Sequence, residues 1–369
     1  MKVTLLLCMF AGLTCAKALA ADGPLSVLPI DVVLDYNYGT GHLHNGTGAP
    51  LYPLNPDYWP RFIAELRRTP PQVLIVGKEA PFTHSLGPIA SYGGENQTFP
   101  AIGGKDGRYR LTPEQTRQRI AAIRKFVDEV HAAGVPKVMP YVSLITMFGE
   151  PEKRIGFWEF YDHWDEYAKD FDLGPRPEGD PLDWAQRDKE GKTYFKWGPD
   201  KPHYKPFRRF TVCVNHPGWR AWCHAFTRWI ARVGYDGLWI DNAVEQRCYC
   251  RYCKAEGERL GAPLVAQEFG SLTQRGAQRV WLESHLRLWD ELRKEGERIR
   301  PGFGIYVNYI EIPDNVAVTS HAELCMIEHV WLGIARLLWP GGLWAGSYPA
   351  MPDIKVLHNR TAASPEPRI

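Results

Sequence analysis

Short runs of β-branched and other apolar residues recur along the chain and alternate with segments that have helical spacing. This alternation is typical of βα units, in which the strands pair in parallel and the helices pack against the sheet. The predicted strands span 28–36, 72–77, 137–143, 237–242, 304–309 and 323–330, with a seventh at 355–359. The predicted helices span 56–68, 112–133, 217–233 and 272–299. Because the strands are widely spaced, we predict the α/β class and a (β/α)8 TIM barrel with loop insertions.

Two parts of the chain depart from an ideal barrel. Residues 144–210 are rich in Trp, Tyr, Pro and Gly, and we interpret them as a long insertion after the third strand rather than a separate domain. After the seventh strand only residues 360–369 remain, so the barrel is C-terminally incomplete or the strand count is wrong by one. A doubly wound open sheet is the alternative, but no Gly-x-Gly-x-x-Gly motif follows the first strand.

The N-terminal segment has the pattern of an export signal. A positive start at Lys2, an apolar run over 3–15 and a small-x-small site at 18–20 predict a cleaved signal peptide, 1–20. Cys15 would suggest a lipoprotein, but the residues before it match a lipobox poorly. No later stretch is apolar for the roughly eighteen residues that a membrane span needs. We therefore expect a secreted or periplasmic protein without a membrane span, with the barrel at 21–360 and a tail at 361–369.

Composition excludes one class of partner and suggests another. The formal net charge is +2, and removing 1–20 takes away two lysines and no acids. A chain this close to neutral has no basic footprint for nucleic acid. The chain contains 14 Trp, 17 Tyr and 15 Phe. Most of these are expected to pack the core, but aromatic faces also suit ring-shaped, weakly charged ligands.

Three cysteines lie within six residues, in the pattern Cys248-x-Cys250-x-x-Cys253. Thiolates converging on a tetrahedral zinc explain this spacing, with Cys213 as a distant fourth ligand. Because four cysteine ligands leave no open position for a substrate, such a zinc would be structural. The alternative is a disulfide between Cys250 and Cys253 in an oxidising compartment. Two further cysteines are expected to be buried and inert, Cys223 on an apolar helix face and Cys325 within a strand.

The segment over residues 210–255 resembles the middle of glycoside hydrolase family 42 and of related uncharacterised glycosidase-like barrels. It reads FTVCVNHPGWRAWCHAF…GYDGLWIDNAVEQRCYCRYC. The resemblance implies a barrel in which a Cys-x-Cys-x-x-Cys cluster after the fourth strand binds zinc together with one upstream cysteine. The positions that match this pattern one by one are Cys213, Cys248, Cys250 and Cys253.

The same segment departs from family 42 at the end of the fourth strand. The family has an Asn-Glu pair there, whose Glu is its acid/base, whereas this chain has Asn242-Ala243. The hypothetical glycosyl hydrolase barrels, and more remotely the family 29 α-L-fucosidases, instead have an Asp at the end of this strand. Asp241 matches that position, so the resemblance implies an aspartate at this point of the site.

Five carboxylates lie at or just after predicted strand ends: Asp35, Glu79, Asp241, Glu311 and Glu328. In a (β/α)8 barrel the chemistry lies at the carboxyl ends of the strands. Retaining glycoside hydrolysis needs two carboxyl groups about 5 Å apart, one to attack the anomeric carbon and one to protonate the leaving oxygen and later activate water. We predict Asp241 as the nucleophile and Glu328 as the acid/base, with Glu311 and Glu79 as competing partners. The alternative is that an Asp before Asn at a strand end only caps the next turn.

Polar and aromatic residues near the same strand ends are candidates for binding a sugar. The hydroxyl groups of a sugar need hydrogen-bond partners, and its apolar ring face stacks on an aromatic. The predicted substrate-binding residues are Tyr36, His42, His44, Lys78, Glu79, Tyr141, Trp239, Asn242, Asn308 and His329. The aromatic segment 157–197 is expected either to form a wall of this cleft or to cover a face of the barrel.

These features predict an exported glycoside hydrolase that cleaves an O-glycosidic bond of a carbohydrate by a retaining mechanism with two carboxylates. The missing family 42 glutamate and the short C-terminus favour a first alternative, a carbohydrate-binding barrel without catalysis. The second alternative is a metal-dependent hydrolase in which His42, His44 and Asp35 bind a catalytic metal.

Overall fold

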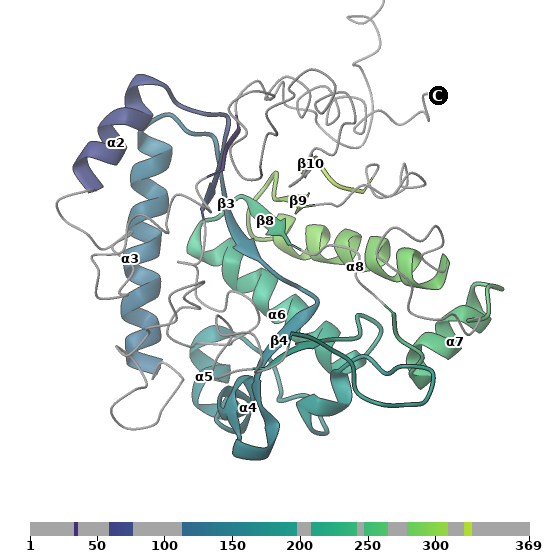
Figure 1. Ribbon diagram of the computed structural model, residues 1–369. Helices are drawn as coiled ribbons and strands as arrows, with labels where there is room; N and C mark the ends of the chain where they lie inside the picture. The colour runs from purple at the N-terminus through teal and green to yellow at the C-terminus, as the bar shows by residue number, and fades with distance from the viewer. Residues whose placement is uncertain are drawn as a thin grey trace, which may run out of the picture.

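The computed structural model describes residues 33–35, 59–76, 113–197, 208–241, 247–264, 279–308 and 321–326. They form a parallel sheet with helices beside it and a smaller antiparallel sheet (Figure 1). The parallel strands are β1 (Val33–Asp35), β2 (Val73–Val76), β3 (Lys137–Val142), β8 (Gly237–Ile240), β9 (Gly304–Asn308) and β10 (Leu324–Met326). All six coincide with predicted strands, and the predicted strand at 355–359 lies outside the described residues.

The six parallel strands lie in the sheet in the order in which they occur along the chain, β1-β2-β3-β8-β9-β10, and every neighbouring pair is parallel. A doubly wound sheet reverses its strand order at a switch point and has helices on both faces. The order of the described strands contains no such reversal, so the doubly wound alternative is wrong for this part of the chain. Within the described residues β1 and β10 are the two edges, and closure into eight strands stays a prediction.

The two faces of the parallel sheet pack against different partners. Successive side chains of a strand point to opposite faces. On one face, Leu74, Val138 and Leu238 belong to the main core together with the helices. The other face forms a separate buried cluster of strand residues, Val73, Ile75, Met139, Trp239 and Tyr306. Helices on one face and a cluster of strand side chains on the other are typical of the wall of a barrel.

The helices of the main core are α2 (Trp59–Arg68), α3 (Pro113–Ala132), α6 (Pro217–Val233) and α8 (Arg279–Glu297). The ends of α6 follow directly from its sequence. The His216 ring accepts a hydrogen bond from the Gly218 N–H, Pro217 occupies the first turn, and Gly234 ends the helix at φ 114°. A further helix, α7 (Arg251–Arg259), was not predicted, because its sequence RYCKAEGER has no apolar periodicity.

The insertion after β3 folds as a four-stranded antiparallel sheet, in the order β5-β4-β7-β6, with short helices. Its elements are β4 (Thr146–Glu150), η4 (Pro151–Lys153), β5 (Ile155–Gly156), α4 (Phe157–Asp162), α5 (Trp164–Phe171), η5 (Pro181–Trp184), β6 (Phe195–Trp197) and β7 (Arg208–Thr211). Phe157 packs edge-to-face on Trp184 and on Trp222 of α6, with ring centroids 5.8 and 5.5 Å apart. Trp158 and Trp164 are buried in the same core. Within the described residues, these aromatic rings pack against α6 and against β7 of the antiparallel sheet, so the insertion shares the main core with the helices.

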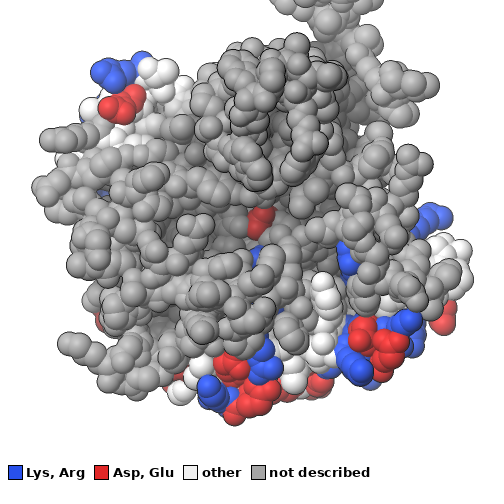
Figure 2. Space-filling model, viewed as in Figure 1, with Lys and Arg blue, Asp and Glu red and all other residues white. Residues whose placement is uncertain are grey.

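Figure 2 shows the charged side chains of the described residues on one face of the molecule. None of the helices in the described ranges is both long enough and apolar enough to cross a membrane. Acidic and basic side chains of the described residues lie intermixed along the lower part of that face. This pattern is typical of a solvated surface with local ion pairs.

Asp236, just before β8, joins several elements at the amino end of the parallel sheet. Its Oδ2 accepts a hydrogen bond from the Val138 backbone N–H at 2.8 Å and lies 2.8 Å from His131 Nε2. Its Oδ1 accepts a hydrogen bond from Arg300 Nε at 2.7 Å. Burial disfavours the ionised carboxylate, but the contacts with His131, the Val138 amide and Arg300 outweigh burial and lower the pKa of Asp236. The network therefore connects β8 to α3, to β3 and to the turn after α8.

We expect Asp236→Asn to lower the free energy of unfolding by about 2 kcal/mol at pH 7, because a buried charge-assisted network loses its anion. The pKa of Asp236 is lowered in the folded state, so its contribution is present above the ordinary value of 3.8 and is lost as pH falls through the folded value. Urea unfolding of both proteins at pH 7 and in acid measures this difference. The control Glu65→Gln, whose side chain is 72% exposed, is expected to change stability by less than about 0.5 kcal/mol. Equal stability of wild type and Asp236→Asn at pH 7 would show that the network contributes nothing.

Candidate functional site

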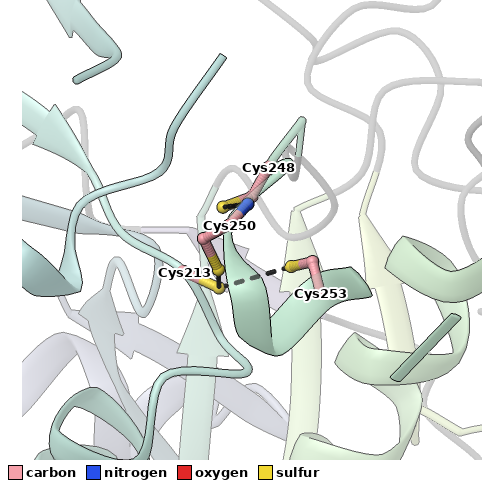
Figure 3. A group of neighbouring side chains, drawn as sticks. All are labelled: Cys213, Cys248, Cys250 and Cys253. Atoms are coloured by element: carbon pink, nitrogen blue, oxygen red, sulfur yellow. Dashed lines mark hydrogen bonds between the residues drawn. The ribbon is translucent and has the colours of Figure 1, made fainter. Parts of the chain in front are cut away.

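Four cysteines from two segments of the chain meet beside the end of β7. Cys213 follows β7, Cys248 and Cys250 precede α7, and Cys253 lies in the first turn of α7. Their sulfur atoms all lie within 4.8 Å of one another. Cys213 Sγ is 3.6 Å from Cys250 Sγ and 3.4 Å from Cys253 Sγ (Figure 3). Because zinc–sulfur bonds of about 2.3 Å in a tetrahedral site place the sulfurs about 3.8 Å apart, this spacing is close to that of a metal site.

The chemistry of the four thiols fits a divalent cation. All four are free in the structure, so the alternative disulfide between Cys250 and Cys253 is not present. Burial raises the pKa of the Cys213 thiol. The pKa of the Cys250 thiol is lowered, chiefly because Cys250 forms a hydrogen bond with Cys213. Four thiolates this close repel one another, and a bound cation compensates their charge. The predicted ligand set is thus confirmed as a cluster that could hold a soft metal ion with every coordination position filled.

Hydrogen-bond donors surround the cysteine cluster. The Arg187 backbone N–H donates to Cys248 Sγ at 3.3 Å, and Asn215 Nδ2 donates to Cys253 Sγ at 3.4 Å. Trp281 Nε1 donates to the Cys248 carbonyl oxygen at 3.0 Å, which fixes the loop before α7 against α8. The motif spacing did not predict these donors. Asn215 lies two residues after Cys213, and this proximity was the one sequence feature that could have indicated it.

Asp241 lies at the carboxyl end of the parallel sheet, directly after β8. Its backbone N–H donates to the Val142 carbonyl oxygen at 2.7 Å, which continues the β3–β8 pairing by one residue. The residue is 9% exposed, so it is nearly enclosed but still reaches the surface. Its predicted partners Glu328, Glu311 and Glu79 lie outside the described residues.

The register of the strands places several predicted positions on one face of the sheet. Asp35 pairs with Ile75, and Tyr141 pairs with Trp239. Because Ile75 and Trp239 belong to the buried cluster of strand residues, Asp35 and Tyr141 lie on the same face of the sheet as that cluster. Asn308 and Asp241 each follow a cluster residue by two positions, which the strand alternation also assigns to this face. The backbone positions of Asp35, Tyr141, Asp241 and Asn308 thus lie along the carboxyl end of one face of the sheet, the face opposite the described helices.

The structure corrects one predicted binding residue. Trp239 is 1% exposed and packs among Met139, Tyr306 and the β2 side chains. Trp239 lies one residue before the end of β8, and its side chain belongs to this apolar cluster, so it is a core residue and not a stacking platform for a sugar. Cys223 is fully buried on α6, as predicted, and Cys325 lies within β10. The other predicted binding residues lie outside the described residues: Tyr36, His42, His44, Lys78, Asn242 and His329.

Comparison with known proteins gives similarity at the level of structure only. No protein-family model and no curated protein matches this sequence. Among solved structures, a beta-galactosidase from Rahnella sp. R3 aligns with TM-score 0.42 and 13% identity over 82% of this chain and 39% of that chain. Gan42B, a GH42 beta-galactosidase from G. stearothermophilus, aligns with TM-score 0.42 and 11% identity over 81% of this chain and 40% of that chain.

A third structure is alpha-L-fucosidase isoenzyme 2 from Paenibacillus thiaminolyticus, with TM-score 0.37 and 14% identity over 79% of this chain and 34% of that chain. The chain therefore spans between 34% and 40% of the length of these three proteins. TM-scores below 0.5 do not assign a fold or a substrate to this chain.

Proposed function

We propose that this protein is a glycoside hydrolase whose active site lies at the carboxyl end of the parallel sheet. The observation that carries the proposal is the placement of Asp241. It directly follows β8, and its backbone N–H donates a hydrogen bond to Val142 of β3. The pairing of the strands assigns Asp35 and Asn308 to the same face of the sheet. In (β/α)8 enzymes, residues from the ends of several strands form the active site at this end of the sheet. The sequence resemblance over residues 210–255 supports a carbohydrate as the substrate.

In the proposed reaction, the Asp241 carboxylate attacks the anomeric carbon of a glycoside. The bond from this carbon to the leaving oxygen breaks as Glu328 donates a proton to that oxygen. Glu328, now a carboxylate, then takes a proton from water, and the water oxygen attacks the same carbon and releases Asp241. Each step inverts the carbon, so the configuration is retained. Glu311 or Glu79 would take the second role if one of them, and not Glu328, faces Asp241.

We propose that the cysteine cluster binds one structural zinc ion. The residues that would hold it are Cys213, Cys248, Cys250 and Cys253. Because cysteine fills all four positions, the ion would supply folding energy and no Lewis acidity to the substrate. Only six residues separate Asp241 from Cys248 in the sequence, so the bound ion would fix the position of the chain shortly after the proposed nucleophile.

We also propose that the protein is exported. The support is the N-terminal pattern alone: the positive start, the apolar run over 3–15 and the small residues at 18–20. Expression of the full chain in a bacterial host, followed by N-terminal sequencing of the periplasmic fraction, tests this proposal. Export predicts a mature protein that begins at residue 21, whereas intact protein in the cytoplasm would contradict it.

The test of the hydrolase proposal is an assay of the zinc-loaded protein against a panel of aryl α- and β-glycosides and oligosaccharides. We expect hydrolysis of at least one member, with NMR showing that the first-formed hemiacetal keeps the configuration of the substrate. An inverted product would reject the retaining mechanism. Sugar binding without turnover would instead identify a carbohydrate-binding barrel, the alternative that Ala243 favours because family 42 has its acid/base there. Hydrolysis that requires a second metal and is lost in His42→Ala would identify a metal-dependent hydrolase.

A further inference from the structure

Asn215 has a buried side-chain amide in contact with the cysteine cluster and with α8. It lies between Cys213 and the start of α6 and is 9% exposed. Its Nδ2 donates to Ser284 Oγ at 2.8 Å and to Cys253 Sγ at 3.4 Å. Its Oδ1 accepts a hydrogen bond from Arg287 Nη2 at 3.4 Å. Both ends of one amide group are therefore engaged, and one of its partners is a candidate metal ligand.

The partners of Asn215 determine which way the amide points. The Ser284 hydroxyl donates its hydrogen to the Val280 carbonyl oxygen, so it can only accept from Asn215. A guanidinium group has donors and no acceptor, so Arg287 must face the amide oxygen. A flipped amide would place oxygen against the sulfur of Cys253 and an N–H group against Arg287. The observed orientation, with N–H directed at the sulfur, is thus the one that satisfies every partner.

Arg287 is itself held in place by a carboxylate on the helix that carries Cys253. Its Nη1 donates to Glu256 Oε1 at 2.7 Å, and Arg259 donates to both oxygens of Glu256. Glu256 is buried and lies one turn after Cys253 on α7. The path from Glu256 through Arg287 and Asn215 to Cys253 therefore begins and ends on α7, and it ties this helix to α8 and to the residues before α6.

We propose that Asn215 is a positioning residue for the metal, which donates its amide N–H to the Cys253 thiolate and holds that sulfur in the coordinating position. This inference rests on the proposed metal site and is independent of glycoside hydrolysis. Four thiolates and one divalent cation leave a buried net charge of −2, and an N–H donor disperses the charge on the sulfur. Hydrogen-bond partners of metal ligands typically change metal affinity by about 10- to 100-fold when they are removed.

The test compares zinc affinity of the full-length protein by competition with a chromogenic chelator. Asn215→Leu has nearly the same shape without the donor, and we expect it to bind zinc about 10- to 100-fold more weakly. Asn215→Asp keeps an acceptor for Arg287 but places a carboxylate beside the thiolate, so its loss should be larger. Arg287→Met leaves Asn215 and Cys253 in place but frees the amide to rotate, and we expect an intermediate loss. Should Asn215→Leu not fold, the other two variants still decide the question.

Cobalt substitution gives a readout that a merely structural role of Asn215 would not change. Removing a hydrogen bond makes the sulfur a better electron donor, so the thiolate-to-cobalt charge-transfer band of Asn215→Leu should shift to longer wavelength. The control Cys223→Ala alters a buried residue of α6 outside the cluster and should leave this band and the zinc affinity unchanged. Wild-type affinity and an unshifted band in the Asn215 variants would overturn the inference. Failure of the wild type itself to bind one metal ion would instead overturn the metal site on which it rests.

Discussion

Replacing Asp241 with asparagine is expected to lower kcat for glycoside hydrolysis by about 10³-fold or more. Asparagine has nearly the same shape but no charge with which to attack the anomeric carbon. The hydrogen bond from residue 241 to the Val142 carbonyl comes from the backbone, so the substitution leaves it in place. Thermal stability and metal content should therefore match those of the wild type. Steady-state kinetics on the best substrate of the glycoside panel measure the effect.

The opposite end of the same strand provides the matched control. Asp236 precedes β8 and Asp241 follows it, and both are buried aspartates. Asp236→Asn should retain kcat at a temperature where it is folded while losing stability, the reverse of Asp241→Asn. Added azide should restore turnover to Asp241→Gly and give a glycosyl azide of inverted configuration, because a small anion can then occupy the place of the nucleophile. Undiminished activity of Asp241→Asn would remove Asp241 from the mechanism.

Replacing Cys253 with alanine is expected to abolish stoichiometric zinc binding and to destabilise the fold. A metal held at about 1,000 times its Kd contributes about 4 kcal/mol of stability, so the loss should lower Tm by an amount on the order of 10 °C. The cluster joins the end of β7, the loop before α7 and the first turn of α7, and these segments would separate more easily without it. Elemental analysis and calorimetry of the purified protein provide the two measurements.

Cys223→Ala is the control for the loss of a buried thiol as such. Cys223 is fully buried, and burial raises the pKa of its thiol, so this side chain stays neutral. The variant should keep one zinc ion per chain and lose about 1 kcal/mol through the small cavity that it creates. One zinc ion per chain in Cys253→Ala, or the same fall in Tm in both variants, would show that the cluster is not a metal site.

The strands of the parallel sheet could be predicted because each is a short, continuous run of apolar residues in the sequence. The strands of the insertion could not be predicted in the same way. Its strands are short and pair over long distances, such as Thr146 with Thr211, so the information that forms them is not local. Helix α7 was missed for a different reason. Its residues are mostly polar, and contacts through Cys253 and Glu256 hold it in place instead of an apolar face.

In the candidate site, too, features that depend on a short motif could be predicted, whereas features that depend on tertiary packing could not. The cysteine cluster was predictable because three ligands lie in one short motif and a metal requires thiols to converge. The role of Trp239 was not predictable, since an aromatic residue near a strand end can pack in the core or line a cleft with the same sequence pattern. The hydrogen bond from Asn215 depends on Ser284 and Arg287, which are brought to it by the packing of α8.

The most direct test of the proposed mechanism is the distance between the carboxyl groups of Asp241 and Glu328 in a crystal structure of the zinc-bound protein. We expect both groups to face one cavity at the carboxyl end of the parallel sheet, about 5–5.5 Å apart, as a retaining glycosidase requires. A separation well beyond about 9.5 Å, or side chains that open to different surfaces, would contradict it, because the two groups could not then act on one glycosidic bond.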